Sequence, residues 1–231
     1  MLEGQFIGVQ EPKSVFTLKK RFTVLKSGRI LLHATALGLY FAEVNGERVG
    51  DAYIAPGWTS YKKMLQVQEY DVTDLLREGE NEIVFTVSEG WYCGPLTWEH
   101  KRNVFGAQTA ICADIIADGK TVLSTDENWT ARESHIRESG IYNGETVDYT
   151  AECKPLTPVV VSFDKNVLVP QISEPVRNTE RIPVKKIIRT PKGELVYDFG
   201  QNIAGVVEVK TPENFDGTLI LQHAEILVNG N

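Results

Sequence analysis

Four carboxylates lie in stretches rich in glycine or aromatic residues that read as loops: Glu89, Glu99, Glu145 and Asp148. Paired carboxyl groups can cleave a glycosidic bond when they stand about 5–5.5 Å apart (retention) or about 6.5–9.5 Å apart (inversion). The chain has 31 acidic residues, so chance alone places several of them in loops, where they cap turns or face water. We therefore assign no catalytic residue, and a glycosidase built on these carboxylates stays the alternative hypothesis.

Loop aromatic residues suggest a second chemistry, because an aromatic ring can cover the apolar C–H face of a sugar while neighbouring polar groups bond its hydroxyls. The candidate carbohydrate-binding residues are Trp58, Tyr61, Trp91, Tyr92, Trp98, Asp51 and Asn45. The competing interpretation is structural, since large aromatic side chains also seal the end of a sandwich. It is favoured for Trp58 and Trp91, whereas Trp98 lies outside any strand period and both interpretations stay open for it.

The composition argues against several classes of protein. The 231 residues carry 24 Lys and Arg against 31 Asp and Glu, a net charge of −7, whereas nucleic-acid binders need a basic surplus. No apolar run approaches the roughly 18 residues of a membrane helix, so no membrane partner is expected. The four histidines show no metal-ligand spacing.

Cysteine use favours a reducing compartment. Cys93, Cys112 and Cys153 are odd in number and widely spaced, which fits neither a disulfide framework nor a CxxC site. The first residues also lack a basic start and an apolar secretory segment, so we expect a cytoplasmic protein. Cys93, expected in a loop, is the thiol to test for reactivity, and Cys112, in an apolar strand, is expected to be inert.

The elements that must position these residues read almost entirely as strands. Alternating apolar residues mark strands at 16–24, 30–34, 38–44, 83–87, 109–116 and 121–123. Asn45-Gly46 and Asp118-Gly119 are hairpin turns, and a single helical turn is expected over 71–77. Many short strands separated by Gly, Asn and Asp turns predict an all-β, jelly-roll β-sandwich.

A second, smaller unit is expected after this sandwich. Half of the ten prolines fall between residues 155 and 183. Because proline cannot donate to a sheet ladder, we expect a connector over 166–183, after a sandwich at 1–165. Strands at 194–198, 205–210 and 218–223 would then open a second β-sandwich over 184–231 that is incomplete.

Five motifs, in order along the chain, resemble motifs of one known enzyme family. Ala-Pro-Gly-Trp-Thr-Ser-Tyr (55–61), Glu-Gly-Trp-Tyr-Cys-Gly (89–94) and Ile-Tyr-Asn-Gly-Glu-Thr-Val-Asp (141–148) resemble the N-terminal domain of bacterial α-L-rhamnosidases. Asp-Phe-Gly-Gln-Asn-Ile-Ala-Gly (198–205) and His-Ala-Glu-Ile-Leu (223–227) resemble the start of the β-sandwich that follows it.

The resemblance implies a non-catalytic, galactose-binding-like module whose enzyme hydrolyses terminal α-L-rhamnosides with an α/α-barrel that is absent from this chain. The module would support that barrel and hold rhamnose-containing glycans near it. No cofactor is assigned. Some relatives bind rhamnose with the help of a calcium ion, and calcium stays an open alternative, because its ligands are not located in this sequence.

A second partner is expected from the incomplete unit. Apolar Val206, Val207 and Leu219 would lie on an open strand edge, and open edges invite pairing with another chain. We therefore expect some homodimerisation.

Overall fold

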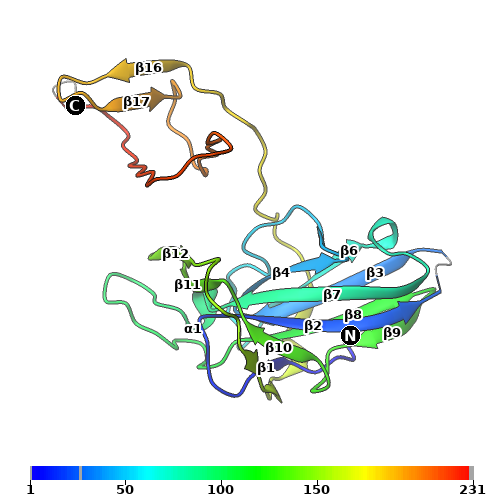
Figure 1. Ribbon diagram of the computed structural model, residues 1–231. Coiled ribbons are helices and arrows are strands. Elements are labelled where there is room, and N and C mark those ends of the chain that lie inside the picture. Colours follow the sequence, from blue (N-terminus) through cyan, green and yellow to red (C-terminus); the bar gives the residue numbers. More distant parts are fainter. Residues whose placement is uncertain (1, 26–27, 229–231) are drawn as a thin grey trace. The chain divides into compact units, whose positions relative to one another are not determined.

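The computed structural model describes residues 2–25 and 28–228, which divide into two units at Arg177 and Asn178. The first unit is a sandwich of two sheets that face each other (Figure 1). Every strand pair in it is antiparallel except β15 with β6, which is parallel. The all-β jelly-roll fold expected from the strand spacing is confirmed.

The larger sheet has seven strands, in the order β14 (Pro158–Val160), β1 (Ile7–Val9), β8 (Ala110–Ala117), β3 (Ile30–Leu37), β6 (Leu65–Asp71) and β15 (Leu168–Pro170), with β9 (Lys120–Ser124) on β8. The six-stranded sheet runs β13 (Pro155–Leu156), β10 (Thr130–Glu133), β2 (Val15–Val24), β7 (Gly79–Ser88), β4 (Leu39–Val44) and β5 (Glu47–Arg48). A separate hairpin is formed by β11 (Ile136–Gly140) and β12 (Gly144–Val147). The helical turns are η1 (Thr73–Leu75), α1 (Gly90–Cys93) and η2 (Lys165–Val167).

Both predicted hairpin turns are confirmed. Asn45 and Gly46 have φ values of 53° and 85° and join β4 to β5, and Asp118 and Gly119 join β8 to β9 with φ values of 50° and 71°. Positive φ at both central residues is the requirement of a type I′ turn, whose twist matches that of paired strands. The helical turn expected over 71–77 is the shorter η1.

The main core lies between the two sheets. Alternate residues of β2 point inward, as do those of β7 and β3, because side chains alternate across a strand. Phe16, Leu18 and Phe85 are among the side chains that are wholly buried there. This alternation is what the sequence pattern predicted.

A second core covers the outer face of the seven-stranded sheet. Leu37, Leu65 and Cys112 face away from the first core and pack with Tyr61 and Tyr92. The segment that contains Phe163 and Val167 packs over them, and β15 extends the sheet. Residues 166–177, expected as a connector, therefore belong to the first unit in this structure.

The second unit pairs β16 (Lys186–Arg189) with β17 (Leu195–Asp198). The strands expected at 205–210 and 218–223 are not formed, which corrects that prediction. A strand needs a neighbouring strand edge and an apolar face to cover. Over the two segments in question the apolar side chains stay exposed, Val206 at 85% and Ile220 at 78% among them.

Asn81 ties the β4–β5 turn to the segment before β7. Its side-chain carbonyl accepts hydrogen bonds from the Asn45 side chain (2.8 Å) and the Arg77 amide (3.0 Å), and its amide group donates to the Arg77 and Gly79 carbonyls. Substitution Asn81→Ala should lower the free energy of unfolding by about 2–3 kcal/mol, since it leaves buried polar groups unpaired. Urea unfolding measures this loss. The exposed control Asn143→Ala should change it by less than about 0.5 kcal/mol, and equal effects of the two substitutions would contradict the assignment.

Candidate functional site

Two tryptophans from distant parts of the sequence stack against each other at one end of the sandwich. Trp58 comes from the loop after β5, and Trp91 from α1. Their ring centroids are 5.6 Å apart and their planes are 14° from parallel. Trp58 is 52% exposed and Trp91 is half-buried, so the pair combines a partly covered ring with an accessible ring face.

Tyr61 and Tyr92 form a second aromatic layer, which Phe105 joins to Trp58. Each is buried, and their rings meet edge to face with centroids 5.1 Å apart. Phe105 joins the layers, because its ring contacts both Tyr61 (4.9 Å) and Trp58 (6.5 Å). Burial raises the pKa of the Tyr61 hydroxyl. Both tyrosines, predicted as sugar contacts, are buried in the second core.

The other predicted sugar contacts are dispersed. Trp98 is 99% exposed at the tip of the turn closed by the Leu96–Lys101 bridge, and no ring contact to it is found among the described residues. Asn45 lies at the far end of β4, where its side chain donates to the Leu75 carbonyl and to Asn81. Asp51 forms an ion pair with Arg177, with Nε and Oδ1 2.9 Å apart.

A hollow of about 200 Å³ adjoins the tryptophan pair. One wall is the loop over residues 52–58, and the opposite wall is the segment over residues 171–176, which we call the strap. Gln68 of β6 lies between these walls and also lines the hollow. Sequence reasoning missed Gln68, although Gln66, Gln68 and Tyr70 place three polar residues at a period of two on one strand.

The wall formed by the loop is conformationally strained. Ile54 has a φ of 47°, a left-handed conformation that is rare for a β-branched residue. Two backbone hydrogen bonds flank it, Tyr40 N–H to the Ala55 carbonyl (2.9 Å) and Tyr53 N–H to the Val176 carbonyl (2.8 Å). Backbone strain of this kind persists only where the surroundings enforce it, and such strain concentrates at binding sites.

The carboxylates considered for catalysis are mostly engaged in structural contacts. Glu89 pairs with Arg102 and accepts from the Ser14 hydroxyl, and Glu99 pairs with Lys101. Asp148 accepts from the Thr150 hydroxyl and amide, and these bonds hold the pKa of its carboxyl below the usual range. Glu145 is exposed on β12. Their contacts match the competing interpretation, in which loop carboxylates cap turns and pair on the surface.

Cys93 has a different environment from the one expected. It lies in α1 at 3% exposure and packs in the second core. Burial raises the pKa of its thiol to about 12, and burial likewise raises that of Cys112 to about 12. A thiol with such a pKa is almost wholly protonated near neutral pH and is a poor nucleophile. The structure therefore favours no reactive role for Cys93.

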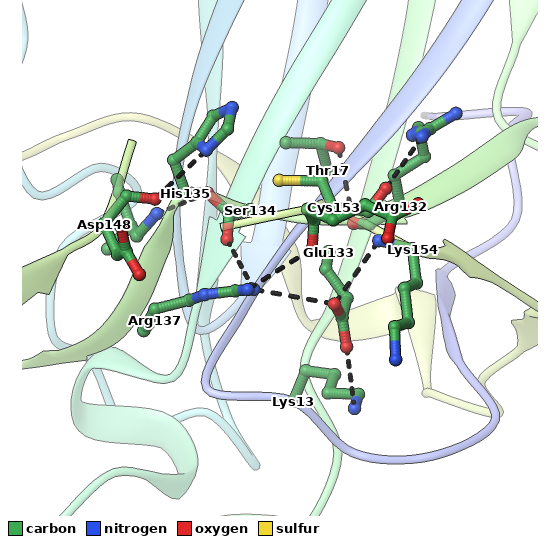
Figure 2. A network of polar contacts seen from close by, with 12 residues as sticks. Lys13, Thr17, Arg132, Glu133, Ser134, His135, Arg137, Asp148, Cys153 and Lys154 are labelled. Atoms are coloured by element: carbon green, nitrogen blue, oxygen red, sulfur yellow. Dashed lines mark hydrogen bonds and ion pairs between the residues drawn. The ribbon is translucent and has the colours of Figure 1, made fainter. Parts of the chain in front are cut away.

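A polar network around Glu133 anchors the segment that carries β11 and β12. Figure 2 shows the Glu133 carboxylate between the Lys13 ammonium (3.3 Å) and the Arg137 guanidinium (3.5 Å). It also accepts from the Lys154 amide (3.3 Å). The Arg132 side chain donates to the Cys153 carbonyl (2.7 Å), and His135 and Asp148 pair through their backbones (2.8 Å). The motif at 141–148 is thereby held against the six-stranded sheet.

The comparisons with known proteins agree with this architecture. The sequence model of the α-L-rhamnosidase N-terminal domain matches residues 26–180. The chain belongs to this family. Residues 188–231 match the bacterial α-L-rhamnosidase concanavalin-like domain, which follows the first unit of this rhamnosidase N-terminal chain.

Individual relatives are similar over most of the chain. An α-L-rhamnosidase from Streptomyces avermitilis is 35% identical over an alignment of 218 positions, which covers 87% of this chain and 21% of the relative. The crystal structure of native α-L-rhamnosidase from Aspergillus terreus matches with a TM-score of 0.77 and 32% identity, over 87% of this chain and 26% of that one. The S. avermitilis α-L-rhamnosidase complexed with L-rhamnose gives a TM-score of 0.71 and 31% identity, over 83% and 20%. The chain thus spans about a fifth to a quarter of the length of these relatives.

The structure locates no calcium ligands among the described residues of this rhamnosidase N-terminal chain. Within the described ranges, no three His, Cys, Asp or Glu side chains gather closely enough to hold a metal ion. Asp51, the acidic candidate in the binding set, is already paired with Arg177. Across the same residues, no helix is long and apolar enough to cross a bilayer.

The Glu133 network makes the stability of the protein depend on pH. Its hydrogen bonds to the Lys154 amide and Lys13 lower the pKa of Glu133 below the ordinary 4.5. The stabilisation is therefore complete above that value and is lost as the pH falls through the lowered pKa. Glu133→Gln should be less stable than the unaltered protein near neutral pH, and urea titrations should show the difference shrinking below pH 4.5.

Glu138→Gln, on the exposed side of β11, is the matched control and should show no difference at any pH. A stability gap for Glu133→Gln that stays constant down to about pH 3 would contradict the role of the charge.

Proposed function

We propose that this chain is the non-catalytic N-terminal module of an enzyme that hydrolyses terminal α-L-rhamnosides, and that the hollow beside Trp58 and Trp91 holds rhamnose-containing glycans. The observation that carries the proposal is the stacked tryptophan pair at the edge of the hollow, in a chain of this family. The substrate class comes from the relatives, which are α-L-rhamnosidases.

The chemistry of the hollow suits a 6-deoxy sugar. The exposed Trp58 face gives apolar cover to ring C–H groups and to a methyl substituent. Gln68, Ser173 and Glu174 supply groups that hydrogen-bond hydroxyls, and no Lys or Arg lines the hollow within the described residues. These features support a neutral, hydroxylated ligand.

A weak site of this kind would act by tethering. Binding a glycan on the module raises the effective concentration of its rhamnosyl ends near the catalytic part of the same polypeptide, without any new chemical group. Catalysis itself is assigned to the part of the relatives that this chain does not match. The three unpaired cysteines support a reducing, cytoplasmic location as part of the same proposal.

Sugar binding is tested by titrating L-rhamnose into the chain, with and without calcium, and following heat or amide chemical shifts. The unaltered protein should bind with a dissociation constant in the range of about 1–10 mM, and Trp58→Ala should weaken binding by about tenfold because it removes the stacking face.

Trp98→Ala is the matched control, since it removes an equally large and more exposed ring outside the hollow, and it should leave binding unchanged. If the unaltered chain shows no response at about 50 mM L-rhamnose, the binding half of the proposal is wrong and only the supporting role remains.

We also propose that the second unit drives self-association. Its apolar residues are exposed, Val206, Val207 and Leu219 among them, and β16 and β17 pair only with each other in the described residues. Sedimentation velocity should show dimers that increase with protein concentration, and the combined change Val206→Asp and Leu219→Asp should shift the chain toward monomer. A monomer at all concentrations would contradict this proposal.

A further inference from the structure

The Gln68 side chain is a buried amide with only one of its ends occupied. Gln68 is 1% exposed and lines the hollow. Its carbonyl oxygen accepts a hydrogen bond from the Tyr40 hydroxyl (3.0 Å). Its nitrogen has no hydrogen-bond partner among the described protein groups. A buried polar group without a partner is costly, so each one calls for an explanation such as a bound ligand or water.

Either orientation of the amide leaves one end for a ligand. The Tyr40 hydroxyl also lies 3.2 Å from the Ala34 carbonyl, so it can donate there and accept from the Gln68 nitrogen instead. The end that faces away from Tyr40 is then the carbonyl oxygen rather than the nitrogen. A sugar hydroxyl both donates and accepts, and it therefore satisfies the amide in either orientation.

The strap lines the hollow together with Gln68 and is fastened at two points. On one side, the Gln66 side chain accepts from the amides of Ile172 (2.9 Å) and Ser173 (3.0 Å). On the other side, the Val176 carbonyl accepts from the Tyr53 amide and Arg177 pairs with Asp51.

Glu174 and Pro175 lie between these two anchor points. Both line the hollow, and neither forms a hydrogen bond to the sheets in the described structure. Because Gln68 is only 1% exposed, access of a sugar to its amide requires this span to move outward. Glu174 then stands at the rim, where its carboxylate can accept from a second hydroxyl.

We propose that Gln68 is the anchor of the hollow: its free amide end binds one ring hydroxyl of the sugar once the Glu174–Pro175 span has moved outward. This inference rests on the proposed carbohydrate function and names the residue that selects a hydroxylated ring over an apolar one. Trp58 supplies the apolar contact and Gln68 supplies the polar one.

The experiment compares L-rhamnose binding by the full chain and by Gln68→Met, which keeps the length of the side chain and removes its amide. We expect Gln68→Met to bind about tenfold more weakly, the change in affinity that loss of one buried hydrogen bond gives. Gln10→Met, the same change at an exposed position outside the hollow, should leave the affinity unchanged.

A second measurement uses the unaltered protein, in case Gln68→Met does not fold. The side-chain amide signals of Gln68 in a ¹⁵N–¹H spectrum should shift as L-rhamnose is added, with the same midpoint as the Trp91 indole signal. Signals of Gln68 that stay in place while that of Trp91 moves would overturn the anchor role.

The outcomes separate the two proposals. Equal binding by Gln68→Met and the unaltered chain, with weaker binding by Trp58→Ala, overturns the anchor and leaves the proposed function standing. Absence of binding by the unaltered chain overturns the carbohydrate proposal and this inference together.

Discussion

The constraint on which the structure depends is that its seven-stranded sheet is buried on both faces. The six-stranded sheet covers one face, and the aromatic layer with the segment around Phe163 covers the other. The six-stranded sheet can cover only one face of the seven-stranded sheet. Loop segments must therefore pack on the other face to bury its apolar side chains. The loop after β5, α1 and residues 161–177 take up this task, and the tryptophan pair and the hollow are formed by the same segments.

The segments that form the site are therefore the same segments that form the second core. Tyr61 and Tyr92 bury their rings in the second core, and Phe105 links the Tyr61 ring to that of Trp58. The strap is similarly part of the sheet edge, because it continues directly from β15. Binding groups that are fixed by packing lose little conformational entropy when a ligand arrives, which is what a weak sugar site requires.

The sandwich could be predicted from local pattern because its causes are local. The Asn45-Gly46 turn follows from backbone freedom at two adjacent residues, and the inward residues of β2 follow from a period of two. The stacking of Trp58 on Trp91 is a contact across 33 positions that no local signal encodes, and the burial of Tyr61 depends on a second core formed by residues far along the chain. The strands expected at 205–210 and 218–223 are missing for the same reason: a local pattern does not supply the neighbouring strand edge that pairing needs.

The fastening of the strap has a mechanical consequence. Arg177 is the last residue of the first unit, and tension applied to the chain beyond it is borne first by the Asp51–Arg177 ion pair and the Tyr53–Val176 hydrogen bond. The hydrogen bonds of Gln66 to the strap would bear the tension next, followed by the parallel pairing of β15 with β6. The load would thus spread over successive anchor points, and the hollow lies between the first and the second of them. The strap residues that line the hollow therefore lie along the path of this load.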